Sequence, residues 1–263
     1  MRLRGAHVLV TGASRGIGGC MADLAAARGA HVTLVARSAG PVGERAAALG
    51  GTALPVDLAD RAARADVVAR AEQLSGRALD VLVNCAGVDA HGGLREVDAA
   101  SMARLFEVNL LAPAELVRQA LPGMVARGRG HLVSVSSGFS AVTAPGLVPY
   151  AASKAGMSHF HAGVRTELRG SGVGTTLVEI GPVRTGMWDG IVAQGLARGA
   201  LQRFQQLRLA VLSEPEHVAA AVLDAVEADR PHVVLPRRMT PVMAFGWIPR
   251  RVSDLALLGV PRR

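Results

Sequence analysis

The chain has 263 residues, of which 50% are apolar and only 3% are aromatic. A core of this size suits one large α/β domain, in which Ala, Val and Leu pack between parallel strands and their covering helices. The formal net charge is +8, but the body of the chain holds no basic run with interleaved aromatic residues, so we expect no nucleic-acid partner.

Cysteine usage and the first residues indicate a reducing compartment. Cys20 and Cys85 show no metal-ligand spacing, so we expect neither a disulfide framework nor a metal site. Residues 1–4 are basic and precede apolar residues, as in a signal peptide, but the apolar run is short and leads into a glycine-rich turn. No segment approaches the ~20 apolar residues of a membrane span. We therefore expect a cytoplasmic protein.

A glycine-rich turn follows the first predicted strand, at residues 6–10. The sequence TGASRGIG occupies residues 11–18 and leads into an Ala-rich helix that runs to about residue 28. The free N–H groups and the dipole at such a helix start attract phosphate, while glycines allow close approach of the ligand. The residues expected to contact a nucleotide cofactor here are Gly12, Ser14, Arg15, Gly16, Ile17 and Gly18.

The second predicted strand, at residues 31–36, ends at Arg37 and Ser38. In a dinucleotide-binding fold an acid at this point binds the ribose 2′-hydroxyl, whereas an arginine accommodates a 2′-phosphate. Arg37 and Arg15 therefore favour NADP(H) over NAD(H); the alternative is that both are simply solvated.

The next two predicted strands end in further candidate cofactor contacts. Residues 52–56 precede Asp57 and Leu58, and a helix is expected over residues 59–75. The strand at residues 79–83 ends in the sequence NCAG, where Ala86 and Gly87 leave room for a flat ring or a ribose. Asn84 can hold this turn through side-chain hydrogen bonds. Cys85 has no obvious base nearby and is interpreted as a small buried filler.

The second half of the chain continues the alternation. A helix is predicted over residues 99–125, and its Asn109 is either a satisfied core amide or part of a functional relay. Three more strands are predicted at residues 131–135, 175–180 and 232–235. A helix that starts near Tyr150 and runs to about residue 169 separates the first two of them.

Strands that alternate with helices in this way predict βαβ units. We expect a Rossmann-like doubly wound parallel sheet of about seven strands, with helices on both faces, in one domain over residues 1–236. Residues 237–263 form an apolar, Arg-flanked C-terminal extension.

Tyr150 and Lys154 are the only tyrosine and the only lysine of the chain. Their spacing puts both side chains on one helix face. A neighbouring ammonium favours the phenolate, so we expect Lys154 to lower the pKa of Tyr150 and make it a proton donor or acceptor nearer neutral pH. Taken alone, the pair is better explained as a half-buried Tyr beside a surface Lys on an ordinary helix; the other motifs reverse that preference.

The order TGASRGIG, NCAG, Asn109, a Ser before the Tyr, YAASK and IGPVRT resembles the short-chain dehydrogenase/reductase family over residues 6–235. The resemblance implies that Tyr150 is the general acid/base and that Lys154 holds the nicotinamide ribose. Ser137 would hydrogen-bond the substrate oxygen, a role less expected of Ser136 and Ser140. Asn109 would complete a tetrad by fixing a water that relays protons.

The resemblance also assigns further cofactor contacts. Asp57 and Leu58 would contact adenine, and the remaining cofactor contacts would be Asn84, Ala86, Gly87, Gly181, Val183 and Thr185. Two positions depart from the family pattern. Cys85 stands where the family often has a second Asn, and Ile180 stands where it often has Pro; here the Pro comes later, at Pro182.

These features together predict an NADP(H)-dependent oxidoreductase that interconverts a ketone or aldehyde and an alcohol. The alternative is a nucleotide-binding sensor or scaffold that has lost catalysis. Large apolar residues over residues 186–212 suggest a hydrophobic substrate, with plain helix packing as the alternative. We expect a homodimer or homotetramer. The extension is expected to act as a lid, a subunit contact or a segment in weak contact with a membrane surface.

Overall fold

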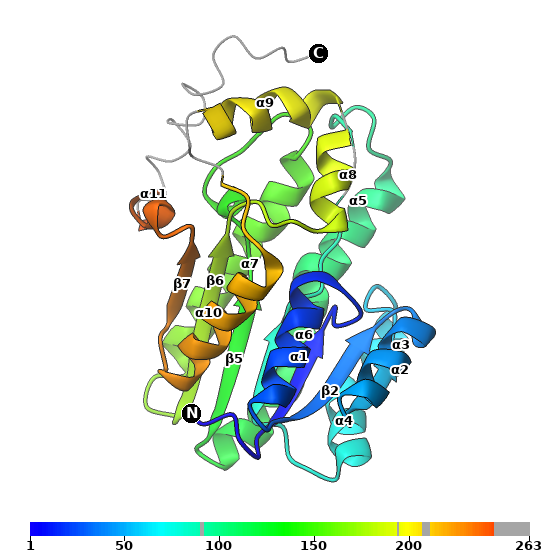
Figure 1. The fold of residues 1–263 in the computed structure, drawn as a ribbon, viewed down its shortest axis with the longest axis vertical. Helices are drawn as coiled ribbons and strands as arrows, with labels where there is room; N and C mark the ends of the chain where they lie inside the picture. Colours follow the sequence, from blue (N-terminus) through cyan, green and yellow to red (C-terminus); the bar gives the residue numbers. More distant parts are fainter. Residues whose placement is uncertain (90–91, 194, 207–210, 245–263) are drawn as a thin grey trace.

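The computed structural model describes residues 1–89, 92–193, 195–206 and 211–244. Seven strands form one sheet in the order β3-β2-β1-β4-β5-β6-β7, and every neighbouring pair is parallel (Figure 1). The strands are β1 (His7–Thr11), β2 (His31–Ala36), β3 (Thr52–Pro55), β4 (Val81–Asn84), β5 (Gly130–Val135), β6 (Val173–Ile180) and β7 (His232–Leu235). The predicted single-domain, doubly wound fold is confirmed, and no strand boundary differs from its predicted position by more than two residues.

Helices cover both faces of this sheet and its carboxyl end. They are α1 (Gly16–Ala27), α2 (Ala39–Ala48), α3 (Arg61–Arg64), α4 (Val67–Ser75), α5 (Ala99–Phe106), α6 (Ala112–Ala126), α7 (Val148–Glu167), α8 (Gly186–Ala193), α9 (Gly195–Gln206), α10 (Pro215–Glu227) and α11 (Thr240–Ala244). A π-helical turn η1 (Glu107–Leu111) joins α5 to α6, and two 3₁₀ turns, η2 (Gly138–Ser140) and η3 (Arg237–Met239), follow β5 and β7.

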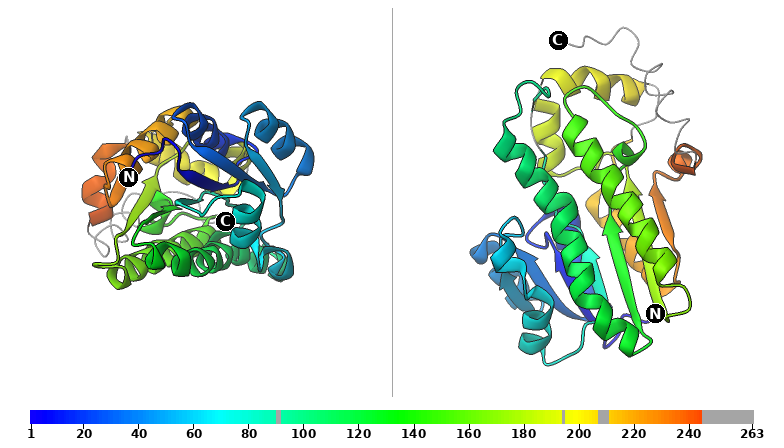
Figure 2. Two further views of the ribbon diagram at one scale, coloured as in Figure 1. Left: turned by 90° about the horizontal axis from the view of Figure 1, so that it is seen from below. Right: turned by 180° about the vertical axis from the view of Figure 1, so that it is seen from behind.

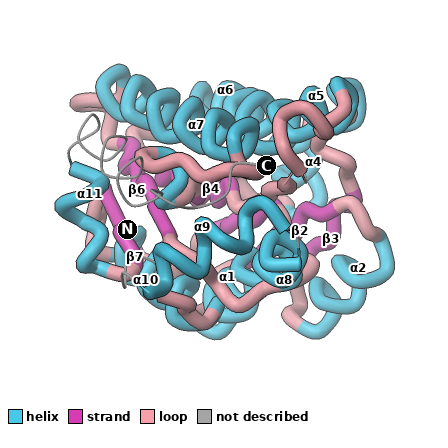
Figure 3. Tube along the Cα trace, turned by 90° about the horizontal axis from the view of Figure 1, so that it is seen from above, coloured by secondary structure: helices cyan, strands magenta, loops and turns pink. Residues whose placement is uncertain are grey.

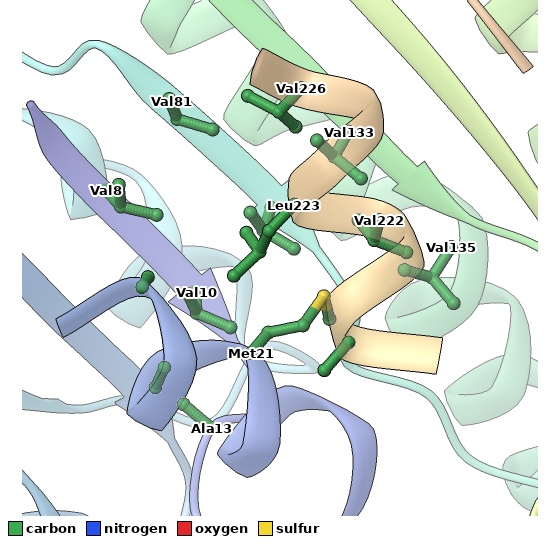
Figure 4. Packing of buried hydrophobic residues seen from close by; sticks show 14 of the residues in the cluster. Val8, Val10, Ala13, Met21, Val81, Val133, Val135, Val222, Leu223 and Val226 are labelled. Carbon is green, nitrogen blue, oxygen red and sulfur yellow. The ribbon is translucent and has the colours of Figure 1, made fainter. Parts of the chain in front are cut away.

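Successive side chains along each strand point to opposite faces of the sheet and so pack against different helices. Val8 and Val10 of β1 face α1 and α10, where Met21 and Leu223 pack on them (Figure 4). Leu9 points to the opposite face, in the cluster formed with α4, α6 and α7. Both faces are therefore buried, as a parallel sheet requires. Figure 3 shows α6 and α7 on one side and α1 and α10 on the other, and the right-hand view of Figure 2 shows the two long green helices crossing the sheet.

Several helices differ from the predicted ones. The single helix expected over residues 99–125 is interrupted by the π-helical turn around Asn109. The helix expected over residues 59–75 is two helices, because Asp60 caps α3 and a second start follows at Asp66. No helix was predicted over α2 or α10.

The strand order places one topological switch point in the middle of the sheet. The chain leaves β1 towards β2 on one side, and β4 lies on the other side of β1. Ligands of such folds bind outside the carboxyl ends of the strands at this point. Helices α8 and α9 lie over the same end of the sheet (Figures 1 and 3).

Among the described residues, no helix is both long and apolar enough to cross a membrane. Of the predicted C-terminal extension, only residues 237–244 are described; they form η3 and α11. The rest of that segment, residues 245–263, lies outside the described residues.

Candidate active site

The β1–α1 turn makes close backbone contact with the end of β4. Gly12 has φ +70°, and a Cβ built there would stand 2.9 Å from the Cα of Ala86. A Cβ at Gly18 would stand 2.4 Å from the carbonyl oxygen of Gly12. A side chain at Gly12 would push the turn away from the end of β4, and one at Gly18 would push α1 away from the end of β1. Because α1 begins at Gly16, its first N–H groups lie at the carboxyl edge of the sheet.

Thr11 fixes the same turn and was not among the predicted site residues. Its buried hydroxyl accepts hydrogen bonds from the N–H groups of Cys85 and Ala86, both at 3.0 Å. It donates to the carbonyl oxygen of Val83 at 3.3 Å. The polar residue at the end of an otherwise apolar strand was the signal that could have indicated it.

Two exposed arginines lie where the sequence predicted them, Arg15 before α1 and Arg37 after β2. Nearby Asp57 is paired with Arg104 at 3.0 Å. Burial opposes ionisation of this carboxyl, but hydrogen bonds from the Ala59 N–H and Arg104 hold the pKa of Asp57 below its ordinary value, with Arg37 adding to the effect. Because Arg104 already pairs with the Asp57 carboxylate, that carboxylate does not neutralise Arg37, and the end of β2 keeps a positive charge.

Tyr150 lies near the start of α7 and is 8% exposed. Burial raises the pKa of Tyr150 to about 12, while a hydrogen bond with Ser137 acts in the opposite direction. This direction is opposite to the one we expected from Lys154, because the loss of water around the buried phenol raises its pKa. The phenol is therefore protonated at neutral pH.

Ser137 follows β5 and caps the start of the turn η2. Its Oγ accepts the Phe139 N–H at 3.2 Å, so the backbone of η2 orients the hydroxyl that faces Tyr150. Ser137 is 6% exposed. The structure thus brings the predicted Ser and Tyr together from two different elements.

Lys154 lies on the same face of α7, with its Nζ 5.8 Å from the centroid of the Tyr150 ring. Nζ donates to the carbonyl oxygen of Val135 at 3.0 Å, which uses one of its three N–H groups. Burial lowers the pKa of Lys154 to about 8. Lys154 therefore titrates close to neutral pH, and the carbonyl oxygen at the end of β5 holds its Nζ in place.

Asn109 is buried in the π-helical turn and ties two elements together. Its Nδ2 donates to the carbonyl oxygen of Val88 and its Oδ1 accepts the Val88 N–H, both at 2.9 Å, and Nδ2 also donates to Ser153. A Cβ at Gly87 would stand 3.5 Å from Asn109 Oδ1 and 3.6 Å from Lys154 Nζ. Glycine at this position keeps a small space between the two polar groups. π-Helical turns of this kind are frequent at functional sites.

The segment after β6 reaches the glycine-rich turn. The Gly181 N–H donates to the carbonyl oxygen of Leu235 at 2.7 Å, and the Thr185 hydroxyl donates to the carbonyl oxygen of Val183 at 3.2 Å. A Cβ at Gly16 would lie 3.4 Å from the Thr185 side chain. Thr185, the last of the predicted cofactor residues in the chain, therefore lies against the glycine-rich turn that holds the first of them.

Apolar side chains surround the phenol. The Phe139 ring lies 6.4 Å from the Tyr150 ring and 6.4 Å from the Phe204 ring, edge to face in both cases. Met187 of α8 and Leu105 of α5 belong to the Tyr150 cluster. The predicted apolar residues Met187, Trp188, Ile191 and Phe204 all join these clusters. Leu196 and Leu207 lie among the residues whose side chains are not described.

The other predicted residues occupy supporting places. Ser38 is exposed before α2, Leu58 is buried in the core, and Ser14 and Ile17 are half-buried. The Asn84 amide donates to the carbonyl oxygen of Pro113 at 3.3 Å, and its buried Oδ1 has no partner among the described residues.

Burial raises the pKa of Cys85 to about 12, so its thiol is protonated and a poor nucleophile, as a filler role requires. No group of three or more His, Cys, Asp or Glu residues in the described ranges could hold a metal ion.

Comparison with known proteins identifies the family. A family model described as short chain dehydrogenase matches residues 6–195. The chain belongs to the short-chain dehydrogenase family. Within this family of oxidoreductases, the chain is 34% identical over 241 residues to the ketoacyl reductase HetN of Nostoc, covering 89% of this chain and 79% of that one. It is also 35% identical to an uncharacterized oxidoreductase, YbbO, of Escherichia coli, over 70% of this chain and 68% of that protein.

Solved structures of short-chain dehydrogenases share the fold. One from Sphingobium yanoikuyae, in complex with NADPH, superposes with a TM-score of 0.77 at 28% identity and covers 98% of this chain and 97% of its own. A metagenomic short-chain oxidoreductase in complex with NADP gives a TM-score of 0.71 at 32% identity, over 89% of this chain and 98% of its own.

Proposed function

We propose that this protein is an NADP(H)-dependent oxidoreductase that interconverts a hydrophobic ketone or aldehyde and its alcohol. The observation that carries the proposal is the buried phenol of Tyr150, hydrogen-bonded to Ser137, with the Lys154 ammonium 5.8 Å from its ring. These three side chains come from two elements at the carboxyl edge of the sheet, where such folds bind nucleotides.

The residues present fit a nicotinamide dinucleotide with a 2′-phosphate. The glycines of the β1–α1 turn leave the start of α1 open to phosphate oxygens, and a Cβ at Gly87 would fill the space beside Lys154 and Asn109. Arg37 and Arg15 offer positive charge for the 2′-phosphate, and two solved relatives were obtained with NADP or NADPH. When bound, NADPH supplies the hydride that reduces the carbonyl carbon.

The side chains of the chain supply the proton and hold the oxygen. Tyr150 is protonated at neutral pH and donates its proton to the carbonyl oxygen as negative charge develops there. Ser137 donates a second hydrogen bond to the same oxygen. Lys154 offers its remaining N–H groups to ribose hydroxyls and stabilises the phenolate that forms, and Asn109 fixes the segment around Val88 beside it.

An apolar substrate is favoured by the surroundings of the phenol. Phe139, Met187 and Leu105 pack around Tyr150, and α8 and α9 add a second apolar cluster above them. A ligand that reaches the phenol oxygen must displace or contact these groups, so binding gains most from apolar surface. A ketone or alcohol carried on a hydrocarbon group therefore fits better than a charged sugar.

Tyr150→Phe tests the proposal directly. The variant keeps the ring but lacks the proton, so we expect turnover with NADPH and a panel of hydrophobic ketones to fall by about 10³-fold or more. NADPH binding, followed by its fluorescence, should stay within about twofold of wild type. Cys85→Ala, a change to a half-buried thiol that the proposed chemistry does not use, is the matched control and should leave turnover nearly unchanged. Wild-type turnover retained in Tyr150→Phe would refute the role of the phenol.

We also propose a cytoplasmic homodimer or homotetramer that binds no nucleic acid. The apolar extension over residues 237–263 would then act as a lid, a subunit contact or a membrane-surface segment. The described part of the extension lies close to the site. Met243 Cε would lie 4.0 Å from a Cβ built at Gly138, the residue that follows Ser137. Light scattering of the full chain and of a chain ending at residue 236, with flotation on anionic vesicles, separates these roles.

A further inference from the structure

Glu179 is a buried carboxylate that the proposed chemistry does not use. It lies near the end of β6 and is 6% exposed. Its Oε1 accepts hydrogen bonds from Ser140 Oγ at 2.5 Å and from Ser158 Oγ at 3.2 Å. Its Oε2 pairs with His232 Nε2 at 2.8 Å. A buried carboxylate is tolerated only where several donors meet it, and here three do.

One of these bonds reaches the segment that carries Ser137. Ser140 is the last residue of η2, and Ser137 is the N-cap of that turn. The Ser140 N–H donates to the carbonyl oxygen of Ser137 at 2.9 Å. The carboxylate of Glu179 therefore holds the far end of the same short turn. Movement of this turn would change the distance between the Ser137 hydroxyl and the phenol of Tyr150.

The second bond reaches the helix that carries Lys154. Ser158 lies one helical turn after Lys154, and its hydroxyl also pairs with Ser136 Oγ at 2.8 Å. Ser136 Oγ in turn donates to the carbonyl oxygen of Lys154 at 3.1 Å. Glu179 is thus connected on one side to the Ser137 turn and on the other to the Lys154 turn of α7.

We propose that Glu179 is a positioning residue that fixes the Ser137 turn against α7 and so sets the distance between Ser137 and Tyr150. The inference rests on the proposed function of those two side chains. Hydrogen bonds to an ionised group are stronger than neutral ones, which suits a carboxylate to this task. Reaction geometry is sensitive to small errors, because a displacement of about 1 Å can cost about 10²-fold in rate.

The test compares variants of Glu179 with a matched control. Glu179→Ala removes all three bonds, and we expect kcat to fall by about 10- to 100-fold while the Kd for NADPH changes by less than about twofold. Glu179→Gln keeps an oxygen that accepts from both serines, so kcat should recover to within about fivefold of wild type. Asp80→Asn is the control. Asp80 is an equally buried carboxylate that accepts from the His7 N–H and from Arg129 at the opposite edge of the sheet, so its loss should affect stability but not kcat.

Hydrogen exchange of the backbone amides of residues 138–142 gives a readout that needs no substrate. We expect faster exchange there in Glu179→Ala and wild-type exchange in Glu179→Gln and Asp80→Asn. If Glu179→Ala does not fold, Ser140→Ala removes only the bond to the Ser137 turn. It should lower kcat and speed exchange in the same direction.

The outcomes separate the two proposals. A wild-type protein that reduces no carbonyl with NADPH would refute the proposed function, and the exchange data would still decide whether Glu179 holds the turn. A wild-type protein that is active, with Glu179→Ala or Ser140→Ala matching Asp80→Asn in kcat, overturns the positioning role whatever the exchange shows.

Discussion

Burial sets the direction in which the pKa values of Tyr150 and Lys154, at the centre of the site, are shifted. It raises the pKa of Tyr150 to about 12 and lowers that of Lys154 to about 8, because water is lost around both charged forms. The spacing in the sequence correctly put both groups on one helix face. It could not show how deeply they lie, since Phe139, Met187 and Leu105 come from other parts of the chain.

The depressed pKa of Lys154 predicts a pH-dependent stability. Between a folded pKa of about 8 and the ordinary value of 10.5, the unfolded chain holds a proton that the folded protein has released. Stability therefore rises with pH in this window, and the buried charge costs most below it. We expect Lys154→Met to stabilise the protein at about pH 7, with the gain shrinking by roughly 1–2 kcal/mol at about pH 9.5. Urea unfolding of both proteins measures this; a pH-independent difference would contradict it.

Arg37 is expected to set the preference between NADPH and NADH. An aspartate at the end of β2 repels a 2′-phosphate and accepts a hydrogen bond from a 2′-hydroxyl, so Arg37→Asp should shift the preference from NADPH towards NADH. We expect the ratio of kcat/KM values to change by about 10²-fold. Arg169→Asp, the same charge change at an exposed position at the end of α7, is the control. An unchanged ratio in Arg37→Asp would remove Arg37 from the cofactor site.

At the scale of elements, the sequence predicted the strands better than the helices. Buried runs of Val and Leu bounded by turn residues identified all seven strands, whereas α2 was not predicted because its sequence contains Gly40, Pro41 and Gly43. The π-helical turn at Asn109 also has no local signal. It is stabilised by the bonds between Asn109 and Val88, which lie in different segments of the chain.

The turn between β1 and α1 gives a prediction for Thr11. Thr11→Val keeps the shape of the side chain but removes the acceptor for the Cys85 and Ala86 N–H groups. Two partly buried donors would lose their partner, so the free energy of unfolding should fall by about 1–3 kcal/mol and NADPH should bind more weakly. Thr166→Val, at an exposed position of α7, should change neither quantity. Equal stability of the two variants in urea unfolding would show that the hydroxyl is dispensable.

At the scale of the whole molecule, two clusters on opposite faces of the sheet stabilise the fold. α10 and α1 pack against each other and against β1, β4 and β5 (Figure 4). The alternation of strands and helices predicted this layered architecture. Which helices would share a face required the strand order, and the order depends on contacts between residues far apart in the chain.

Leu223 lies fully buried in the cluster between α1 and α10. Leu223→Ala should lower the free energy of unfolding by about 2–5 kcal/mol, because it removes apolar contacts and leaves a cavity. The site lies elsewhere, so kcat of the folded protein should stay at the wild-type value. Leu74→Ala, at a position 57% exposed on α4, is the control and should change stability by less than about 0.5 kcal/mol. Thermal unfolding and activity measured on the same samples decide the matter.

The pairing of α1 with α10 has a consequence for biosynthesis. Residues 7–27 leave the ribosome early, but the surface that covers Val8, Val10 and Met21 belongs to residues 218–226. Until translation has passed that point, the nascent chain presents an uncovered strand face and an open helix flank, which are surfaces that favour aggregation. The layer that residues 7–27 begin is therefore completed only once residues 218–226 have been synthesised.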